Sequence, residues 1–323
     1  MKYIVSIIVP VYNVAPYILQ CLQSVVSQTY TGKLECVCVD DCGSDNSMLI
    51  VEDFIQHYVG DVAFKIVRHE KNKGLSAARN TGARNSEGDY LYFLDSDDWL
   101  EPDCLENLMG VLYRYPDCQL IQAFAKKGEK NFLTDAFVGN MPDYCDNPSF
   151  IKRLLLNTHI SIIEAWNKLV RRDFILEHNL YFREGIVNED VLWKFYLAKY
   201  VTRMGVCHHN TYNYRIREDS IMTKPVETRF ESLLKLFSEM TDNIDDFCRE
   251  VQVYSIGKQL YDLYYCLQDP KMKKDIALLM KRLSGHCNGW LSCKLFLFYL
   301  LHDSQMRRVR AGEFLFYQLT VLR

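Results

Sequence analysis

Three carboxylates stand within four residues at the end of an apolar run, and this feature constrains the chain more than any other. The run 90–94 reads Tyr-Leu-Tyr-Phe-Leu and is followed by Asp-Ser-Asp-Asp at 95–98. A β-strand that ends in Asp-x-Asp brings clustered oxygen ligands to one point, which hard cations such as Mg²⁺ or Mn²⁺ prefer. The pattern therefore favours metal-assisted chemistry on a phosphate group. The simpler alternative is a strand and a polar turn, with Asp98 capping a helix over 99–109.

The composition is that of an ordinary globular protein. The 323 residues are 49% hydrophobic and 24% charged, which suits one large α/β domain or two smaller ones. The net charge of −3 argues against a general nucleic-acid binder, so we expect no nucleic-acid partner. No apolar run reaches the roughly 18 residues that a membrane-spanning helix needs.

The twelve cysteines do not form a metal or disulfide pattern. They are scattered, without a CxxC pair or the Cys/His spacing of a zinc site. Cys36 and Cys38 lie in an alternating, strand-like run, which predicts that they face the core as small hydrophobic residues. Because the chain enters a strand directly after Met1 with no signal peptide, we expect reduced thiols and a cytoplasmic protein.

Short apolar runs alternate with helical stretches in the first third of the chain. Strands are expected at 3–11, 34–39 and 63–67, and helices at 13–28 and 47–58. This alternation predicts an α/β fold with a mostly parallel, twisted sheet flanked by helices. Ligands of such a sheet bind beyond the carboxyl ends of its strands. Polar or glycine-containing segments follow those ends at 10–13, 40–45, 69–74 and 95–98. From about residue 227 onward the apolar spacing predicts mostly helices.

Four segments in the first 110 residues resemble the family-2 glycosyltransferases, which have the nucleotide-sugar-binding fold called GT-A. Their order and spacing match that family. The segments are SIIVPVYN at 6–13, VDDCGSD at 39–45, NKGLSAARN at 72–80 and LDSDD at 94–98. The resemblance implies an inverting enzyme of bacterial polysaccharide biosynthesis. It also implies a nucleotide-sugar-binding half at 1–112, an acceptor-binding half at 113–226 and a helical region at 227–323.

The donor side of the resemblance assigns a task to several residues. Tyr12 follows a strand end, and its ring can stack on a uracil base. Asp41 can accept the imide N–H of uracil, although capping of a helix by the 43–45 turn is an alternative for Asp40 and Asp41. For Arg79 the alternative is a surface ion pair. The nucleotide contacts that the resemblance adds are Pro10, Asn72, Arg79 and Ser96.

The Asp-x-Asp carboxylates are the expected metal ligands. By resemblance, Asp95 approaches the ribose and shares the metal site with Asp97, which is the main ligand. Mg²⁺ or Mn²⁺ would bridge the donor diphosphate and act as a Lewis acid toward the leaving group. Asp98 lies outside the motif and stays a candidate helix cap.

The acceptor side rests on fewer residues. Glu189 and Asp190 resemble an acidic pair near the acceptor, which implies Asp190 as the general base; favourable partners of a helix dipole are the alternative. Arg215 resembles an arginine in a loop over the donor diphosphate, and an exposed loop arginine is the alternative. Trp166 and Lys168 fall where the family lines its acceptor pocket. A buried tryptophan beside a surface lysine would explain them equally.

The expected reaction is a single displacement from a nucleotide-sugar donor, with uracil as the family's usual base. The acceptor would be a saccharide or a lipid-linked saccharide. Two other classes stay open. One is a non-catalytic nucleotide-sugar-binding protein that keeps only the donor half. The other is a metal-dependent phosphohydrolase, although its Asp-x-Asp motif usually lies on the first strand.

The C-terminal end is basic and aromatic. Residues 271–323 carry a net charge of +7. Such a segment suits peripheral contact with the anionic inner face of a membrane, where a lipid-linked acceptor would lie. The alternative is a helical cap that packs on the catalytic domain or on a second subunit, which would make a homodimer.

Overall fold

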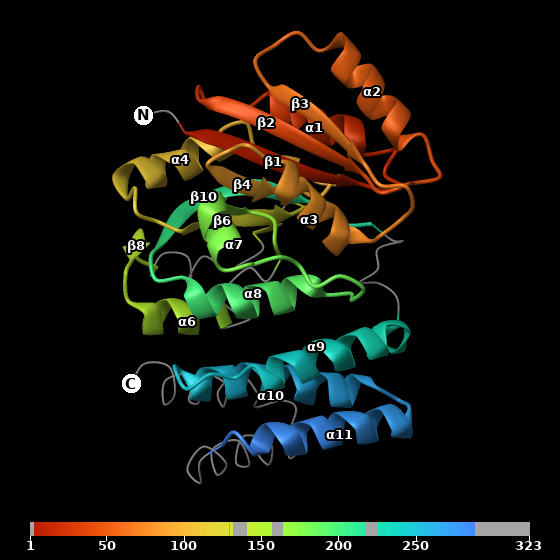
Figure 1. Cartoon of the computed structure of the whole chain (residues 1–323), viewed down its shortest axis with the longest axis vertical. Helices are drawn as coiled ribbons and strands as arrows, with labels where there is room; N and C mark the ends of the chain where they lie inside the picture. Colours follow the sequence, from red (N-terminus) through yellow and green to blue (C-terminus); the bar gives the residue numbers. More distant parts are fainter. Residues whose placement is uncertain (1–2, 129, 132–140, 157–163, 218–224, 288–323) are drawn as a thin grey trace. The chain divides into compact units, whose positions relative to one another are not determined.

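The computed structural model describes residues 3–128, 130–131, 141–156, 164–217 and 225–287 (Figure 1). The chain divides into two compact units. Unit 1 comprises 1–151 and 162–223, and unit 2 comprises 152–161 and 224–323. The expected parts 1–112 and 113–226 therefore fall largely within unit 1, and 227–323 falls within unit 2.

The first four strands of unit 1 form a parallel sheet in the order β3-β2-β1-β4 (Figure 1). The expected strands are all present, and the first helix is shorter than 13–28 because 14–17 form a turn. The strands are β1 (Ile4–Val11), β2 (Lys33–Asp40), β3 (Ala63–Arg68) and β4 (Tyr90–Phe93). The helices between them are α1 (Ile18–Val26), α2 (Ser47–His57) and α3 (Leu75–Asn85).

Burial on both faces explains why β1 is a nearly continuous apolar run. Val5, Ile7 and Val9 belong to a core cluster that also holds buried residues of α1 and α4. Ile8 points the other way and lies against α3, because successive strand side chains alternate between the two faces. Cys36 and Cys38 are buried in the same cluster as Val5, which confirms the core role expected for them.

The second half of the sheet is mixed. β9 (Lys168–Arg171) runs antiparallel between β4 and β6 (Leu120–Lys127), and β10 (Met204–Tyr214) runs parallel to β6. The α/β fold with a sheet flanked by helices is thus confirmed, with its parallel part concentrated in the first four strands. The remaining elements of this half are α4 (Cys104–Arg114), β7 (Lys130–Asn131), β8 (Tyr144–Cys145), α6 (Pro148–Leu156), α7 (Arg172–Glu177) and α8 (Glu189–Tyr200).

The helix expected over 99–109 begins later than the sequence suggested. β5 (Trp99–Leu100) pairs antiparallel with β10, and α4 starts only at Cys104. Asp98 is therefore not a helix cap, and that expectation was wrong. Its carboxylate accepts hydrogen bonds from the Tyr212 hydroxyl and the Arg215 backbone N–H instead.

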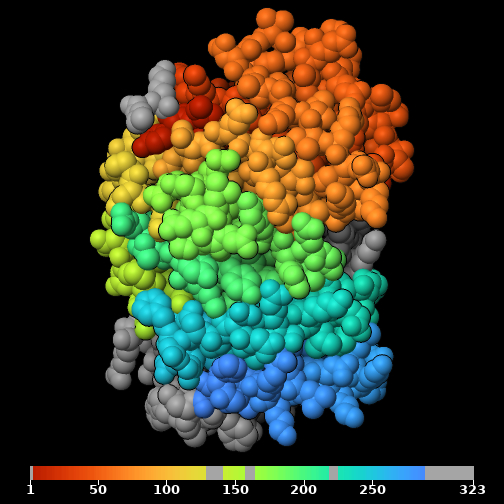
Figure 2. Space-filling view, viewed as in Figure 1, coloured from red at the N-terminus to blue at the C-terminus, as the bar shows by residue number. Residues whose placement is uncertain are grey.

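In the described part of unit 2, three helices pack on one another, and their side chains are the cyan and blue atoms of Figure 2. They confirm the helical C-terminal region expected from the apolar spacing. Lys152 is almost completely buried, and its Nζ donates to Asp245 at 3.1 Å and to the Phe247 carbonyl at 2.8 Å. The elements are a 3₁₀ turn (Val226–Arg229), α9 (Phe230–Asp242), α10 (Arg249–Cys266) and α11 (Pro270–Ser284).

A close approach of α3 to β1 requires glycine at position 82. A Cβ there would stand 2.3 Å from Ile8 Cγ2. We expect Gly82→Ala to lower the free energy of unfolding by about 1–3 kcal/mol, the usual cost of overpacking. In α4, a Cβ at Gly110 meets nothing within 4 Å, so Gly110→Ala should raise stability by about 0.5–1 kcal/mol. Thermal and urea unfolding of both variants checks this. Equal effects would contradict the packing of α3 on β1.

Candidate active site

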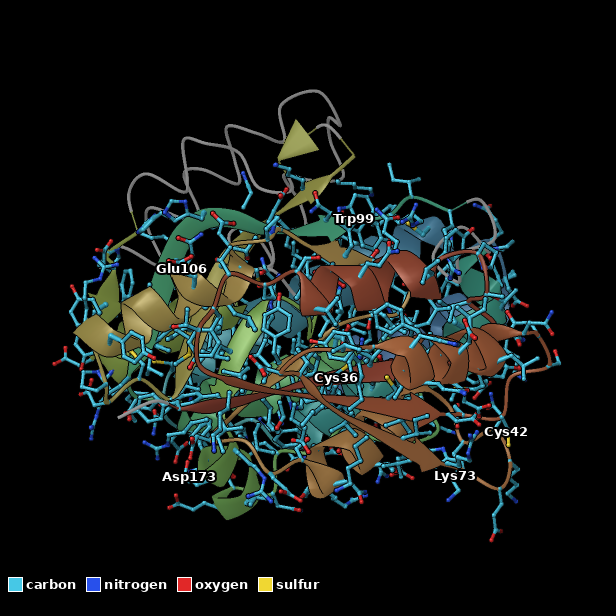
Figure 3. All side chains as sticks on the ribbon, turned by 90° about the horizontal axis from the view of Figure 1, so that it is seen from above. Cys36, Cys42, Lys73, Trp99, Glu106 and Asp173 are labelled. Carbon is cyan, nitrogen blue, oxygen red and sulfur yellow. The ribbon has the colours of Figure 1, made fainter. Side chains whose placement is uncertain are left out.

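The carboxyl ends of the first four strands lie at one edge of the sheet. Val11 is opposite Asp40 in the register, and Asp40 is opposite Arg68. Figure 3 shows Cys42 and Lys73, from the loops after β2 and β3, on the same side of unit 1, and hydrogen bonds of Cys42 to His69 and of Lys73 to Asp41 link the two loops. The polar segments that follow the strands are therefore neighbours in space, as the parallel arrangement predicted.

Asp41 organises the loop 69–74 at this edge. Its carboxylate is buried, with Oδ1 lying 2.7 Å from His69 Nδ1 and accepting from the Lys73 N–H at 2.8 Å. Oδ2 accepts from the Gly74 N–H at 2.9 Å. Gly74 has a φ of +86° and directly precedes α3, so this carboxylate also fixes where α3 begins.

The residues expected around a nucleotide base differ in exposure. Tyr12 is 47% exposed and Asn72 is also exposed, so both can meet a ligand. Pro10 and Ser96 are buried at the ends of β1 and β4. Asp40 does not cap α2, because it accepts from the Cys42 N–H and pairs with an arginine of β3.

Arg79 lies at the centre of the site and is only 1% exposed. Its Nη1 donates to Glu189 Oε1 and to Asp190 Oδ1, each at 2.7 Å. Its Nη2 donates to Asp95 Oδ1, also at 2.7 Å. One guanidinium thus joins α3, the end of β4 and the start of α8. The sequence suggested a nucleotide contact or a surface ion pair for Arg79; the structure shows a buried cation with three carboxylate partners.

Arg215 packs against the Asp-x-Asp turn. Its backbone N–H donates to Asp98 at 2.7 Å, and its Nε donates to the Asp97 carbonyl at 2.7 Å. The guanidinium also lies over the Trp99 ring, 4.7 Å from the centroid. The end of β10 is therefore held directly beside the expected metal ligands. Ser220, in the same stretch of sequence, lies outside the described residues.

Arg217 contacts the expected metal ligand itself. Its Nε lies 3.0 Å from Asp97 Oδ2, and both side chains are 22% exposed. The guanidinium is 5.4 Å from the centroid of the Tyr17 ring. This arginine was not identified from the sequence. Its position two residues after Arg215 on an alternating strand end is the signal that could have pointed to it.

The two expected acceptor residues are both buried. Trp166 stacks on Tyr212, with ring centroids 4.4 Å apart and planes 8° apart. Lys168 is fully buried, and its Nζ donates to the Glu164 carbonyl at 2.6 Å. Lys168 is therefore not the surface lysine of the alternative interpretation.

Lys194 is a second buried lysine on this side, and it was not predicted from the sequence. It follows Asp190 by four residues on α8, so the two side chains share one face of the helix. It is 3% exposed, and no described residue accepts a hydrogen bond from its Nζ. Burial and the charge of Lys168 lower the pKa of Lys194 to about 7, and burial lowers that of Lys168 to about 8.

Burial shifts the pKa values of the site's carboxylates in the opposite direction, upward. It raises the pKa of Asp190 to about 8, with Glu189 and Asp95 adding to the rise and Arg79 opposing it. Burial and the charge of Asp95 also raise the pKa of Asp97, which Arg217 counteracts. Groups with such perturbed pKa values cluster at functional sites.

The Asp-x-Asp residues fit a divalent cation completed by a ligand. Among the described residues, no group of three His, Cys, Asp or Glu side chains is placed to hold a metal on protein ligands alone. Asp95 and Asp97 offer partly exposed carboxylates, at 24% and 22%. Mg²⁺ is commonly bound by one or two carboxylates together with substrate phosphates. The carboxylates of Asp95 and Asp97 suit a cation that is bound jointly by protein and phosphate oxygens.

A family model described as Glycosyl transferase family 2 matches residues 6–178 of the chain. EpsH of Bacillus subtilis is 30% identical over 263 residues, which cover 78% of this chain and 74% of EpsH. GgaB of the same organism, a minor teichoic acid biosynthesis protein, is 25% identical over 289 residues. That match covers 85% of this chain and only 30% of GgaB.

Among solved structures, residues 1–349 of TarS from S. aureus, in complex with UDP-GlcNAc, superpose with a TM-score of 0.73. The superposition covers 99% of this chain and 90% of that one, at 19% sequence identity. At this identity the likeness concerns the fold, which is GT-A as the sequence implied.

The described helices include none with the length and apolar character needed to cross a bilayer. Most of the basic C-terminal segment, from 288 onward, lies outside the described residues. Membrane contact through that segment and a homodimer formed by it remain predictions.

Lys194 and Lys152 form a matched pair for testing the energetics of buried lysines. Lys194→Met removes an ammonium that has no hydrogen-bond acceptor among the described residues, so it should raise the melting temperature at pH 7. Lys152→Met removes an ammonium paired with Asp245 and should lower it.

The benefit of Lys194→Met should also depend on pH. Between about pH 7 and 10.5 the unfolded chain binds the Lys194 proton more tightly than the folded chain, so wild-type stability rises with pH. The difference between variant and wild type should therefore shrink as the pH approaches 10. A lower melting temperature for Lys194→Met at pH 7 would show that this ammonium has a stabilising partner.

Proposed function

Because the chain belongs to glycosyl transferase family 2, we propose that it transfers a sugar from a nucleoside-diphosphate sugar, UDP-linked, to an acceptor hydroxyl with inversion of configuration. The acceptor is a saccharide or a lipid-linked saccharide of a cell-surface polysaccharide. The teichoic acid role in the name of GgaB and the complex of TarS with UDP-GlcNAc support this assignment.

The observation that carries the proposal is the pairing of Asp95 and Asp190 with one guanidinium. Each accepts a hydrogen bond from Arg79 at 2.7 Å, although they lie on different elements. A residue at the end of β4, where a nucleotide sugar is expected, is thereby held close to a carboxylate suited to base catalysis. A transferase needs this proximity because the acceptor hydroxyl must attack the donor carbon directly.

On the donor side, the chain's own residues bind and orient the nucleotide. Tyr12 offers an exposed ring for stacking on uracil. Asp41 Oδ2 retains accepting capacity beyond the Gly74 N–H, which suits the imide N–H of the base. Asn72 and Arg215 complete the contacts to the nucleotide and its diphosphate. Mg²⁺ or Mn²⁺ bound at Asp97 and Asp95 would supply Lewis-acid stabilisation of the departing diphosphate.

On the acceptor side, Asp190 takes the proton of the attacking hydroxyl. Its carboxylate is 16% exposed, so one oxygen can face a ligand while Oδ1 stays on Arg79. Glu189 is more deeply buried and shares the same Nη1, so it positions Arg79 and does not act as the base. A positioned base of this kind is typically worth about 10² to 10⁴ in rate. Trp166 and Lys168 are too deeply buried to face an acceptor themselves, so they support this side from within the unit.

Two isosteric substitutions separate the donor and acceptor roles. Asp97→Asn should abolish the Mn²⁺-dependent part of UDP binding, because it removes the anionic metal ligand. Asp190→Asn should keep UDP binding and lower transfer by about 10²-fold or more. UDP binding is measured by calorimetry with and without Mn²⁺. Transfer is measured as UDP release from UDP-sugars in the presence of a saccharide acceptor panel.

Asp117→Asn is the matched control, because Asp117 forms an exposed ion pair with Arg203 at 3.4 Å. It should leave both quantities unchanged. Normal transfer by Asp190→Asn would exclude Asp190 as the base. Intact UDP binding with no transfer to any acceptor, even in the wild type, would instead favour a non-catalytic nucleotide-sugar-binding protein.

The raised pKa of Asp190 predicts a pH dependence of transfer. The base acts only when deprotonated, so transfer should rise with pH, by up to roughly tenfold per unit, and level off near the pKa of about 8. Single-turnover rates at saturating donor, from pH 6 to 9, measure this. A rate that is flat between pH 6 and 8 would contradict the protonation of Asp190 in this range.

A further inference from the structure

The expected metal ligand Asp97 already has a cationic partner from the protein. Arg217 Nε lies 3.0 Å from Asp97 Oδ2. Tyr17 lies within cation–π distance of both Arg217 and Arg215, at 5.4 Å and 5.0 Å. The aromatic ring therefore supports two guanidiniums beside the Asp-x-Asp turn.

The neighbouring carboxylates are also occupied by protein donors. Asp95 pairs with Arg79, and Asp98 accepts from the Tyr212 hydroxyl and the Arg215 N–H. The partial exposure of Asp97 and Arg217 means that solutes can reach this pair, unlike the buried Arg79. Of the described ion pairs at this turn, the Asp97–Arg217 pair is therefore the one whose partners a ligand can reach and replace.

A divalent cation on Asp97 would compete with Arg217 for the charge of the same carboxylate. With Arg217 Nε still 3.0 Å from Asp97 Oδ2, a cation on the same carboxylate would set like charges against each other at short range. The guanidinium must therefore move to another anion. A diphosphate supplies that anion, because its oxygens match the planar fork of arginine donors.

We propose that Arg217 is the resident counter-ion of Asp97, which a divalent cation must displace, and that a nucleoside diphosphate takes over its guanidinium. This rests on the proposed function, since it assumes that the donor diphosphate binds at this turn. The binding of the metal and the binding of the nucleotide are then cooperative. By linkage, UDP raises the affinity for Mn²⁺ by the same factor by which Mn²⁺ raises the affinity for UDP.

Removing the competitor should weaken this coupling in a defined way. Arg217→Gln should tighten the binding of Mn²⁺ alone by about fivefold or more, and it should reduce the enhancement by UDP by a similar factor. Titrations of Mn²⁺ followed by electron paramagnetic resonance, with and without UDP, measure both quantities without turnover. Arg217→Lys keeps the positive charge and should retain weak binding of Mn²⁺ alone.

Two controls locate the effect. Arg114→Gln removes an exposed arginine that pairs with Asp143 at 3.1 Å on another part of unit 1, and it should change nothing. The double variant Arg217→Gln/Asp97→Asn should lose the gained Mn²⁺ affinity, because the gain requires the Asp97 carboxylate. A gain that survives the Asp97 change would place the cation elsewhere and overturn the proposal.

The outcomes also separate this inference from the proposed function. Unchanged affinity for Mn²⁺ alone in Arg217→Gln overturns the counter-ion role, even if wild-type UDP binding is strong. Failure of the wild type to bind UDP under any condition counts against the proposed function and against the transfer of Arg217 to a diphosphate. The titration of Mn²⁺ alone would still decide whether Arg217 competes for Asp97.

Discussion

The site depends on the hydrogen bonds that the guanidinium of Arg79 donates to three carboxylates. This guanidinium binds Asp95, Glu189 and Asp190, which lie up to 111 residues away in the sequence. A buried arginine is costly unless carboxylates pair with it, so the burial of Arg79 depends on the end of β4 and the start of α8 lying beside α3. The planar fork allows two nitrogens to serve carboxylates from different elements, which the single ammonium of a lysine could not do as well. One side chain thus sets the distance between Asp95 and Asp190.

The ion pairs of the site differ in how far solvent can reach them. Arg79 is fully enclosed, so its partners Asp95 and Asp190 are fixed in place. The Asp97–Arg217 pair is partly exposed and can be exchanged for ligands. The proposed function, in which a cation and a diphosphate bind together and leave after reaction, would use both kinds of pair. The enclosed pairs maintain the geometry, and the exposed pair responds to the ligand.

The sequence predicted those parts of the fold that depend on local pattern. The apolar runs and the polar segments after them identified β1 to β4, and parallel pairing then placed residues such as Asp41 at one edge. The cap expected at Asp98 failed because β5 pairs with residues 212–213 of β10, more than a hundred positions away. The burial of Lys168 was equally hidden, because no local pattern separates a buried lysine from a surface one. The ion pairs of Arg79 could not be read from its place in a helix either.

The residues proposed for the donor and those proposed for the acceptor lie in different parts of the sequence relative to the family match. The family match, at 6–178, contains every residue assigned to the nucleotide base and to the metal, each next to a strand end or a helix start. Asp190 lies beyond it, on a helix whose position follows from long-range packing. Arg79 lies within the match and binds Asp190 at 2.7 Å, so this contact ties the proposed base to the matched part of the chain. Under the proposed function, the residues around Asp190 can change with the acceptor while Arg79 keeps the proposed base in place.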